Sequence, residues 1–146
     1  MNASVNRQIL LVEKPGGKLG PEHFRLVDGA VPEPKEGEVL LHTRLISLDA
    51  ANRAWMHGAT YRSAVEANSV MAGGSISEVV SSKAQGFAPG DLVFADTGWQ
   101  DFAALPATQL TKMPKVEPMS YLLSVFGIAG LTAYFGLLHV GKPKEG

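Results

Sequence analysis

Seven side chains at the ends of predicted strands and helices could bind or protonate a small molecule: Asp49, Asn52, Arg53, Trp55, Tyr61, Trp99 and Thr132. Amides, guanidinium groups and hydroxyls can donate hydrogen bonds to an oxygen that becomes negatively charged during a reaction. Tryptophan is nevertheless most often a core residue, and a tyrosine in a loop is most often amphipathic surface. Residue types alone therefore favour a structural role for this set.

Several other kinds of site can be excluded from the sequence. The chain has no cysteine, so it forms no disulfide and no thiolate metal site. The four histidines (His23, His42, His57 and His139) have no spacing typical of metal ligands, and we expect no bound metal. The run Gly73–Ser77 (GGSIS) lacks the spacing of a serine-nucleophile elbow. Neither a Walker sequence nor a Gly-x-Gly-x-x-Gly fingerprint is present, so no phosphate-binding loop is predicted.

The composition indicates an ordinary folded domain. The chain has 146 residues, enough for one well-buried domain, and its net charge of −1 gives no reason to expect a nucleic-acid partner. The apolar run at residues 9–12 is too short for a secretory signal. Together with the lack of cysteine, this favours the cytoplasm.

Six segments read as β-strands, separated by turns rich in glycine and proline: Arg7–Glu13, His23–Val31, Glu38–Leu48, Ser75–Ser81, Asp91–Ala95 and Trp99–Leu105. In the third segment, Leu41, Thr43 and Leu45 are expected to share one face. Six strands with mostly short connections predict a mainly β fold that closes, or nearly closes, into a barrel.

Two helical regions are expected. Asp49 can cap a short helix that ends at His57. From Pro118 onward the spacing of Leu131, Tyr134 and Leu138 is helical, with a break expected at residues 128–130 and Gly141 as a C-terminal cap.

The second helical region contains no charged residue from Met119 to Val140, which raises the alternative of a membrane span. Glycines interrupt the run. Two shorter helices buried against protein are therefore favoured over one span.

The order of the motifs in the chain carries more information than their composition. They are Leu45–Asp49 followed by Asn52-Arg53, Met71–Gly74, Pro89–Val93, Gly98–Phe102 and Gly130–Leu138. In this order they resemble the zinc-free branch of the medium-chain dehydrogenase/reductase superfamily, and in particular its NADPH-dependent double-bond reductases, which include the prostaglandin, alkenal and curcumin reductases.

The resemblance implies a GroES-like β-barrel substrate domain over residues 1–117 and two linking helices over residues 118–146. In that family the connector matched by Lys142–Gly146 leads into a Rossmann domain that binds NADPH, and this sequence stops before the Rossmann sheet. The implied reaction is hydride transfer to the β-carbon of an α,β-unsaturated ketone or aldehyde, with a tyrosine, a ribose hydroxyl or water protonating the α-carbon. The full-length protein would be a homodimer, and this chain alone is expected to be inactive.

The resemblance also assigns roles to individual residues. Tyr61 matches a loop tyrosine that faces the substrate and is the catalytic candidate. The residues that match positions beside the cofactor or the domain cleft are Asn52, Arg53, Gly73, Gly74 and Thr132. Ala50-Ala51 replaces the family's usual Pro-Tyr, which leaves substrate preference open.

Two alternatives remain. The chain could belong to a quinone reductase of the same superfamily, or to a non-enzymatic β-barrel module that binds a ligand or is tethered to a membrane.

Overall fold

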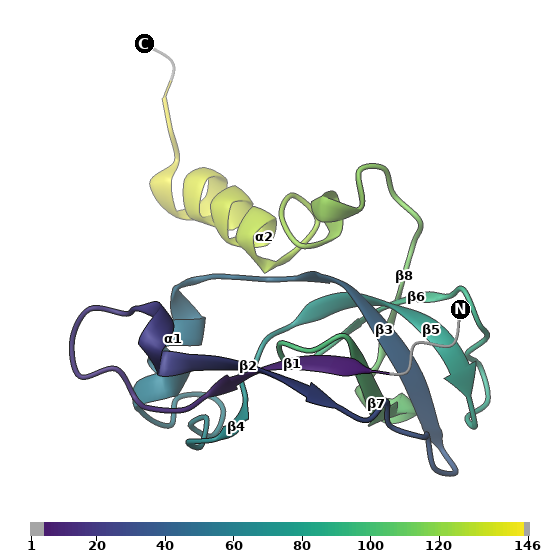
Figure 1. Ribbon diagram of the computed structural model, residues 1–146. Coiled ribbons are helices and arrows are strands. Elements are labelled where there is room, and N and C mark those ends of the chain that lie inside the picture. Colours follow the sequence, from purple (N-terminus) through teal and green to yellow (C-terminus); the bar gives the residue numbers. More distant parts are fainter. Residues whose placement is uncertain (1–4, 145–146) are drawn as a thin grey trace. The chain divides into compact units, whose positions relative to one another are not determined.

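The computed structural model describes residues 5–144, which form two compact units, one ending at Lys112 and the other beginning at Met113. The first unit contains the strands and helix α1 (Ala50–His57), and the second contains helix α2 (Ile128–Phe135) (Figure 1). The boundary expected at residue 117 stays a prediction.

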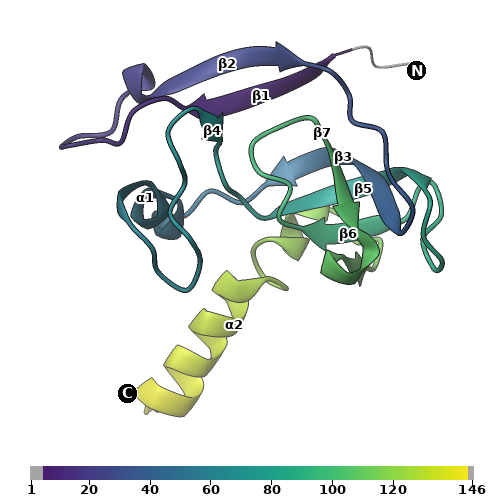
Figure 2. The ribbon, with the colours of Figure 1, turned by 90° about the horizontal axis from the view of Figure 1, so that it is seen from below.

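The first unit is built from two antiparallel sheets (Figure 2). The smaller sheet has the order β2-β1-β4, with β2 at Phe24–Gly29, β1 at Asn6–Leu11 and β4 at Ser69–Val70. The larger has the order β7-β3-β5-β6-β8, with β7 at Phe102–Pro106, β3 at Glu38–Ile46, β5 at Ser75–Ser82, β6 at Leu92–Ala95 and β8 at Thr111–Met113. The mainly β fold and the six predicted strands are confirmed, and the two short strands β4 and β8 were not predicted.

Backbone hydrogen bonds join the two sheets through strand β1. The Ile9 amide donates to the Trp99 carbonyl over 2.9 Å, and the Asp101 amide donates to the Arg7 carbonyl over 3.0 Å. Since residues 99–101 pair with β1 in this way, strand β7 begins only at Phe102, three residues later than predicted. The segment before β7 thus links one sheet to the other.

Strand β3 departs from simple alternation. Its register against β5 shifts between Leu40 and Leu41 and again between Thr43 and Leu45. Leu40 and Leu41 are consequently both buried, whereas Thr43 and Leu45 are only half-buried. The second bulge lies within the face expected for Leu41, Thr43 and Leu45, so the three residues do not follow simple alternation along the whole strand.

Two hydrophobic clusters form the core of the first unit. One is formed by side chains of β3, β5 and β6 in the larger sheet and contains Val39, Leu41, Val79, Val93 and Ala95. The other surrounds α1 and contains Leu11, Trp55, Met56, Val65, Met71 and Ala72. Helix α1 therefore belongs to the core, and the loop that follows it begins on a fixed support.

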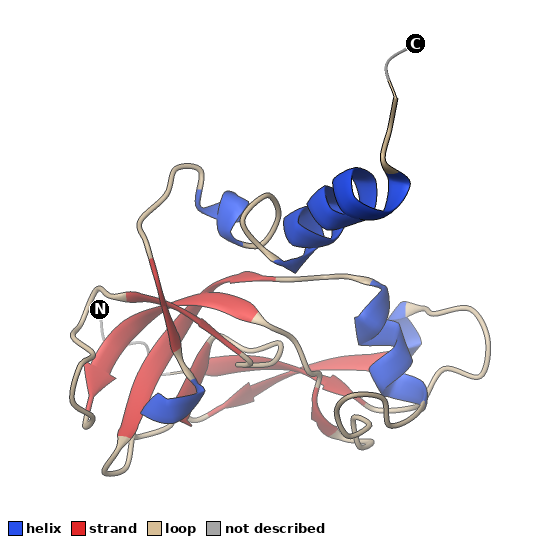
Figure 3. Ribbon diagram, turned by 180° about the vertical axis from the view of Figure 1, so that it is seen from behind, coloured by secondary structure: helices blue, strands red, loops and turns tan. Residues whose placement is uncertain are grey.

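The second unit is helical (Figure 3). A 3₁₀ helix spans Met119–Leu122, and α2 continues into a π-helix at Gly136–Gly141. The two predicted helices are present, but the break between them lies at residues 123–127 and not at residues 128–130, since α2 starts at Ile128. A Cβ at Gly130 would collide with the Val125 carbonyl, so this glycine allows the preceding loop to approach the first helical turn. The left-handed residue at the end is Lys142, with φ 45°, and not Gly141.

Among residues 5–144, no helix has the length and hydrophobicity needed to cross a membrane.

Candidate functional site

Asn52 lies where α1 meets the segment Met71–Gly74. Asp49 caps the helix as predicted, and its Oδ1 accepts a hydrogen bond from the Ala51 amide over 2.8 Å. The Asn52 Oδ1 accepts from the Asp49 amide over 2.7 Å, and its Nδ2 donates to the Ala72 carbonyl over 3.1 Å. The residue is only 5% exposed. Its amide therefore fastens the start of α1 to the segment that carries Gly73 and Gly74.

Replacing Asn52 with alanine is expected to lower the free energy of unfolding by about 2 kcal/mol, because it removes one buried hydrogen bond and half of a capping box. Urea denaturation of the Asn52→Ala protein measures this loss. The matched control is Arg53→Ala, one residue along the same helix but exposed, for which we expect a change within about 0.5 kcal/mol. Equal losses for the two variants would contradict the anchoring role of Asn52.

Arg53 points away from Asn52 and belongs to a different part of the surface. Its Nη2 donates to the Gly17 carbonyl over 2.5 Å, at the turn after β1. The structure thus brings Asn52, but not Arg53, to Ala72 and the glycines that follow it.

Gly73 and Gly74 allow side chains to approach closely. Neither has a positive φ, so the backbone conformation does not itself require glycine at these two positions. A Cβ on Gly73 would lie 2.8 Å from Trp99 Cδ1 and Nε1, and a Cβ on Gly74 would lie 2.9 Å from Phe94. The two aromatic rings occupy the space that larger residues would need.

Tyr61 lies in the loop between α1 and β4 and is 82% exposed. Its ring meets Trp55 edge-on, with centroids 5.9 Å apart and an angle of 87° between the planes. Tyr61 lines an open hollow of about 700 Å³ together with Arg62, Val65, Val70, Ala72 and Asp96, among others. The phenol ring is therefore free to contact a ligand at this surface.

Arg62 is a residue of this hollow that the sequence did not indicate. Its Nη1 is 2.6 Å from Asp96 Oδ2, and its Cζ lies 4.7 Å from the centroid of the Trp55 ring. No spacing rule connects Arg62 with a carboxylate 34 residues away. Only the folded structure shows this pair.

Thr132 belongs to the second unit, in α2. Its hydroxyl donates to the Ile128 carbonyl over 2.7 Å, which is a common arrangement for threonine inside a helix. Its expected role beside the cofactor stays a prediction.

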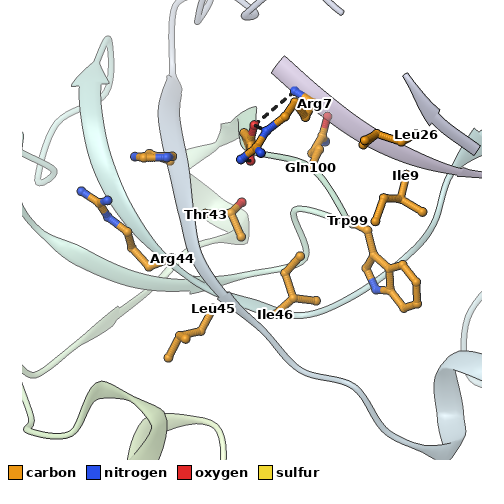
Figure 4. Close-up of a pocket in the computed structure, with 11 residues that line it drawn as sticks. Arg7, Ile9, Leu26, Thr43, Arg44, Leu45, Ile46, Trp99 and Gln100 are labelled. Carbon is orange, nitrogen blue, oxygen red and sulfur yellow. Dashed lines mark hydrogen bonds and ion pairs between the residues drawn. The ribbon is translucent and has the colours of Figure 1, made fainter. Parts of the chain in front are cut away.

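A second hollow, of about 540 Å³, opens between β1, β3 and residues 99–101 (Figure 4). Its charged groups are paired: Arg7 Nε lies 2.7 Å from Asp101 Oδ2, and Arg44 Nη2 lies 2.7 Å from Glu78 Oε2. His42, which also lines it, stacks on Phe102 with ring centroids 4.6 Å apart. With its ionic groups already matched, this hollow offers a ligand little unpaired charge.

Three groups of this hollow have shifted pKa values, and the hydrogen bond to Asp101 raises the pKa of Arg7. The hydrogen bond from Arg7 lowers the pKa of Asp101 below its ordinary value. Partial burial, followed by the charge of Arg44, lowers the pKa of His42.

The His42 shift predicts a stability change at mildly acidic pH. The folded protein favours the neutral ring of His42. The contribution of His42 to the free energy of unfolding is therefore complete above the ordinary histidine pKa and falls as the pH drops from roughly 7 to 5. The loss should stay below about 1 kcal/mol because the ring is only half-buried. Thermal unfolding of wild type and His42→Gln across this range measures it, and a slope that the substitution leaves unchanged would contradict it.

Asp101 contributes at lower pH. Its stabilisation is present above the ordinary aspartate pKa and is lost as the pH falls through the lowered folded-state value. Asp101→Asn should therefore remove part of the dependence below about pH 4.

The N-terminus of α1 is not a place for a dinucleotide's pyrophosphate. A pyrophosphate is usually held by free amides at a helix N-terminus after a glycine-rich turn. At α1 that end is occupied by the Asp49 carboxylate, which would repel phosphate. Within residues 5–144, no three histidine, aspartate or glutamate side chains come together as a metal-binding group.

Comparison with known proteins identifies the family to which this fold belongs. A family described as the N-terminal domain of oxidoreductase matches residues 7–113. The chain belongs to this family. The resemblance to NADPH-dependent enzymes of the medium-chain dehydrogenase/reductase superfamily is thereby confirmed.

Individual relatives match almost the whole chain. The NADPH-dependent curcumin reductase of Escherichia coli is 41% identical over 143 residues, covering 97% of this chain and 41% of its own length. The putative NADP-dependent oxidoreductase YfmJ of Bacillus subtilis is 40% identical, covering 100% of this chain and 43% of its own length. The crystal structure of CurA from Vibrio vulnificus has a TM-score of 0.85 and 39% identity, covering 97% of this chain and 42% of that one. The chain thus spans about two fifths of the length of these relatives.

Proposed function

We propose that this chain is the substrate-side domain of an NADPH-dependent reductase that reduces the carbon–carbon double bond of α,β-unsaturated ketones or aldehydes. Support comes from the likeness to curcumin reductase over nearly the whole chain. CurA from Vibrio vulnificus, a similar protein, has been crystallised with NADPH. In this proposal, the NADPH-binding residues belong mainly to the part of the protein that the chain does not include.

The observation that carries the proposal is the exposure of Tyr61 at the rim of its hollow. The other predicted site residues have their polar groups engaged or have no side chain: Asn52 is bonded to Asp49 and Ala72, and Thr132 to Ile128. Tyr61 alone among the predicted residues of the first unit presents a hydroxyl that no described residue binds.

The proposed reaction moves two electrons and two hydrogens. NADPH, when bound, would supply the hydride for the β-carbon, and negative charge would then collect on the carbonyl oxygen of the substrate. A proton from a tyrosine, a ribose hydroxyl or water would then reach the α-carbon, and the saturated carbonyl compound would be released. The Tyr61 phenol would donate a hydrogen bond to the charged oxygen, and Val65, Val70 and Ala72 would cover the hydrocarbon part of the substrate.

The experiment uses the full-length protein and follows NADPH oxidation at saturating cofactor with an enone, an alkenal and a quinone. Tyr61→Phe should lower kcat for the enone about tenfold, because the ring remains and only the hydrogen bond is lost, while water partly replaces it at this exposed position. His57→Gln, an exposed residue at the end of α1, serves as control. Turnover of quinones but not of enones by the wild-type protein would contradict the proposal in favour of a quinone reductase.

A further inference from the structure

The loop that carries Tyr61 has few attachments to the rest of the first unit. The Gly58 amide bonds to the Ala54 carbonyl over 3.2 Å, and the Val65 amide bonds to the Trp55 carbonyl over 2.8 Å. Between these two points the Thr60 amide bonds only within the loop, to the Arg62 carbonyl. The backbone of residues 59–64 is therefore held at its two ends alone.

Arg62 supplies the missing attachment. Among the described residues, its hydrogen bond to Asp96 is the one that joins residues 59–64 to another part of the fold. Asp96 directly follows β6, a strand of the larger sheet. The loop is thereby connected to the sheet across 34 positions of sequence.

The guanidinium of Arg62 also lies over the indole of Trp55. This ring is 6% exposed and belongs to the core cluster around α1, so it is a fixed support. Tyr61 meets the same indole edge-on. The planar guanidinium of arginine can stack on an aromatic ring and form an ion pair at the same time. The ammonium group of lysine does not share this property.

We propose that Arg62 is a positioning residue for the reduction proposed above. By joining Trp55 to Asp96 it fixes the loop, and so holds the phenol of Tyr61 at the rim of the hollow. Arg62 is predicted to act through Tyr61 and not on the reacting atoms. The effect of Arg62 on the reduction of a substrate rests on the proposed function. The attachment of the loop can be measured without any substrate.

The test uses the full-length protein with Arg62→Met, Arg62→Lys and Asp96→Asn. Methionine keeps an unbranched side chain but loses both interactions, lysine keeps the ion pair and loses the planar stacking, and Asp96→Asn weakens the ion pair from the other side. The matched control is Arg44→Met, which removes an ion pair of similar length (2.7 Å) and exposure from strands β3 and β5.

Two measurements are made on each variant. Amide hydrogen exchange of Thr60 and Val65, whose amides are hydrogen-bonded, should become about tenfold faster in Arg62→Met, with smaller increases in Arg62→Lys and Asp96→Asn. With an aryl-substituted enone, kcat should fall towards the roughly tenfold loss expected for Tyr61→Phe while KM stays within about twofold, because a displaced phenol no longer donates to the charged oxygen. Arg44→Met should leave both quantities at their wild-type values.

The outcomes separate the two proposals. Wild-type exchange in both Arg62→Met and Asp96→Asn would overturn the attachment, and faster exchange with an unchanged kcat would overturn the positioning role. If the wild-type protein reduces no enone while Arg62→Met still accelerates exchange, the proposed function fails and the attachment stands. Should Arg62→Met not fold, Asp96→Asn, which leaves the loop's own residues intact, decides the attachment.

Discussion

Alanine at position 98 is expected to lower the free energy of unfolding by about 3 kcal/mol. Gly98 has φ +71°, a backbone conformation that costs an alanine about 1 kcal/mol. A Cβ there would also lie 2.9 Å from the Met71 carbonyl oxygen and 3.1 Å from Val70 Cγ1. A backbone oxygen cannot rotate away as a side chain can, so relief requires a shift of the buried Met71 segment, at a cost of about 2 kcal/mol.

The fold contains a matched control for this substitution. Gly90 has a similar φ of +87°, but a Cβ there would have nothing within 4 Å. Gly90→Ala should therefore cost only the backbone strain, about 1 kcal/mol, and the difference between the variants isolates the close contact. Chemical denaturation of both proteins gives the two values. If the two variants lose the same free energy of unfolding within error, the Met71 segment shifts at no cost in free energy.

The Gly98 turn also explains why Gly73 and Trp99 are found together. The Gly98 amide bonds to the Gly73 carbonyl over 3.1 Å, and the Trp99 amide bonds to the Met71 carbonyl over 2.7 Å. These bonds bring the Trp99 ring against Gly73. Two motifs of the sequence, Met71–Gly74 and Gly98–Phe102, are thus parts of one packed unit.

Local patterns in the sequence were sufficient for the main elements of the fold. Alternating strands bounded by glycine and proline, and an aspartate before a short helix, are signals confined to a few neighbouring residues. The bulges of β3 were not foreseeable, because they depend on the strands that pair with it. The two-residue strand β4 is too short to show any alternation.

The site was predictable only in part. Tyr61 was indicated by resemblance and is exposed in the structure, but Arg62 and Asp96 meet because a loop after α1 reaches the end of β6. Such a contact depends on tertiary structure, and a single sequence contains no sign of it. Asn52 illustrates the reverse case: its spacing of three from Asp49 fits a cap, and the fold adds a bond to Ala72.

The chain of residues 1–146 is expected to self-associate through its second unit. Segment 125–140 has no charged residue and leaves many large apolar side chains exposed: Val125, Phe126, Ile128, Leu131, Tyr134, Phe135, Leu137, Leu138 and Val140. An apolar surface of this kind tends to be covered by another protein surface. Sedimentation over a range of concentrations should therefore show dimers or larger species.

Replacing Leu131 and Leu138 with serine should weaken the association at least about a hundredfold. The two leucines are 52% and 47% exposed and lie seven residues apart, Leu131 in α2 and Leu138 in the π-helix that continues it. Each chain of a dimer would lose both contacts, and about 1 kcal/mol per half-buried leucine accounts for a change of this size.

Leu26→Ser and Leu48→Ser, which replace exposed leucines of the first unit, provide the control. If these two abolish the association and the helical pair does not, the contact surface lies on the first unit. If the wild-type chain stays monomeric at high concentration, the exposed leucines of the helix are covered within a single molecule.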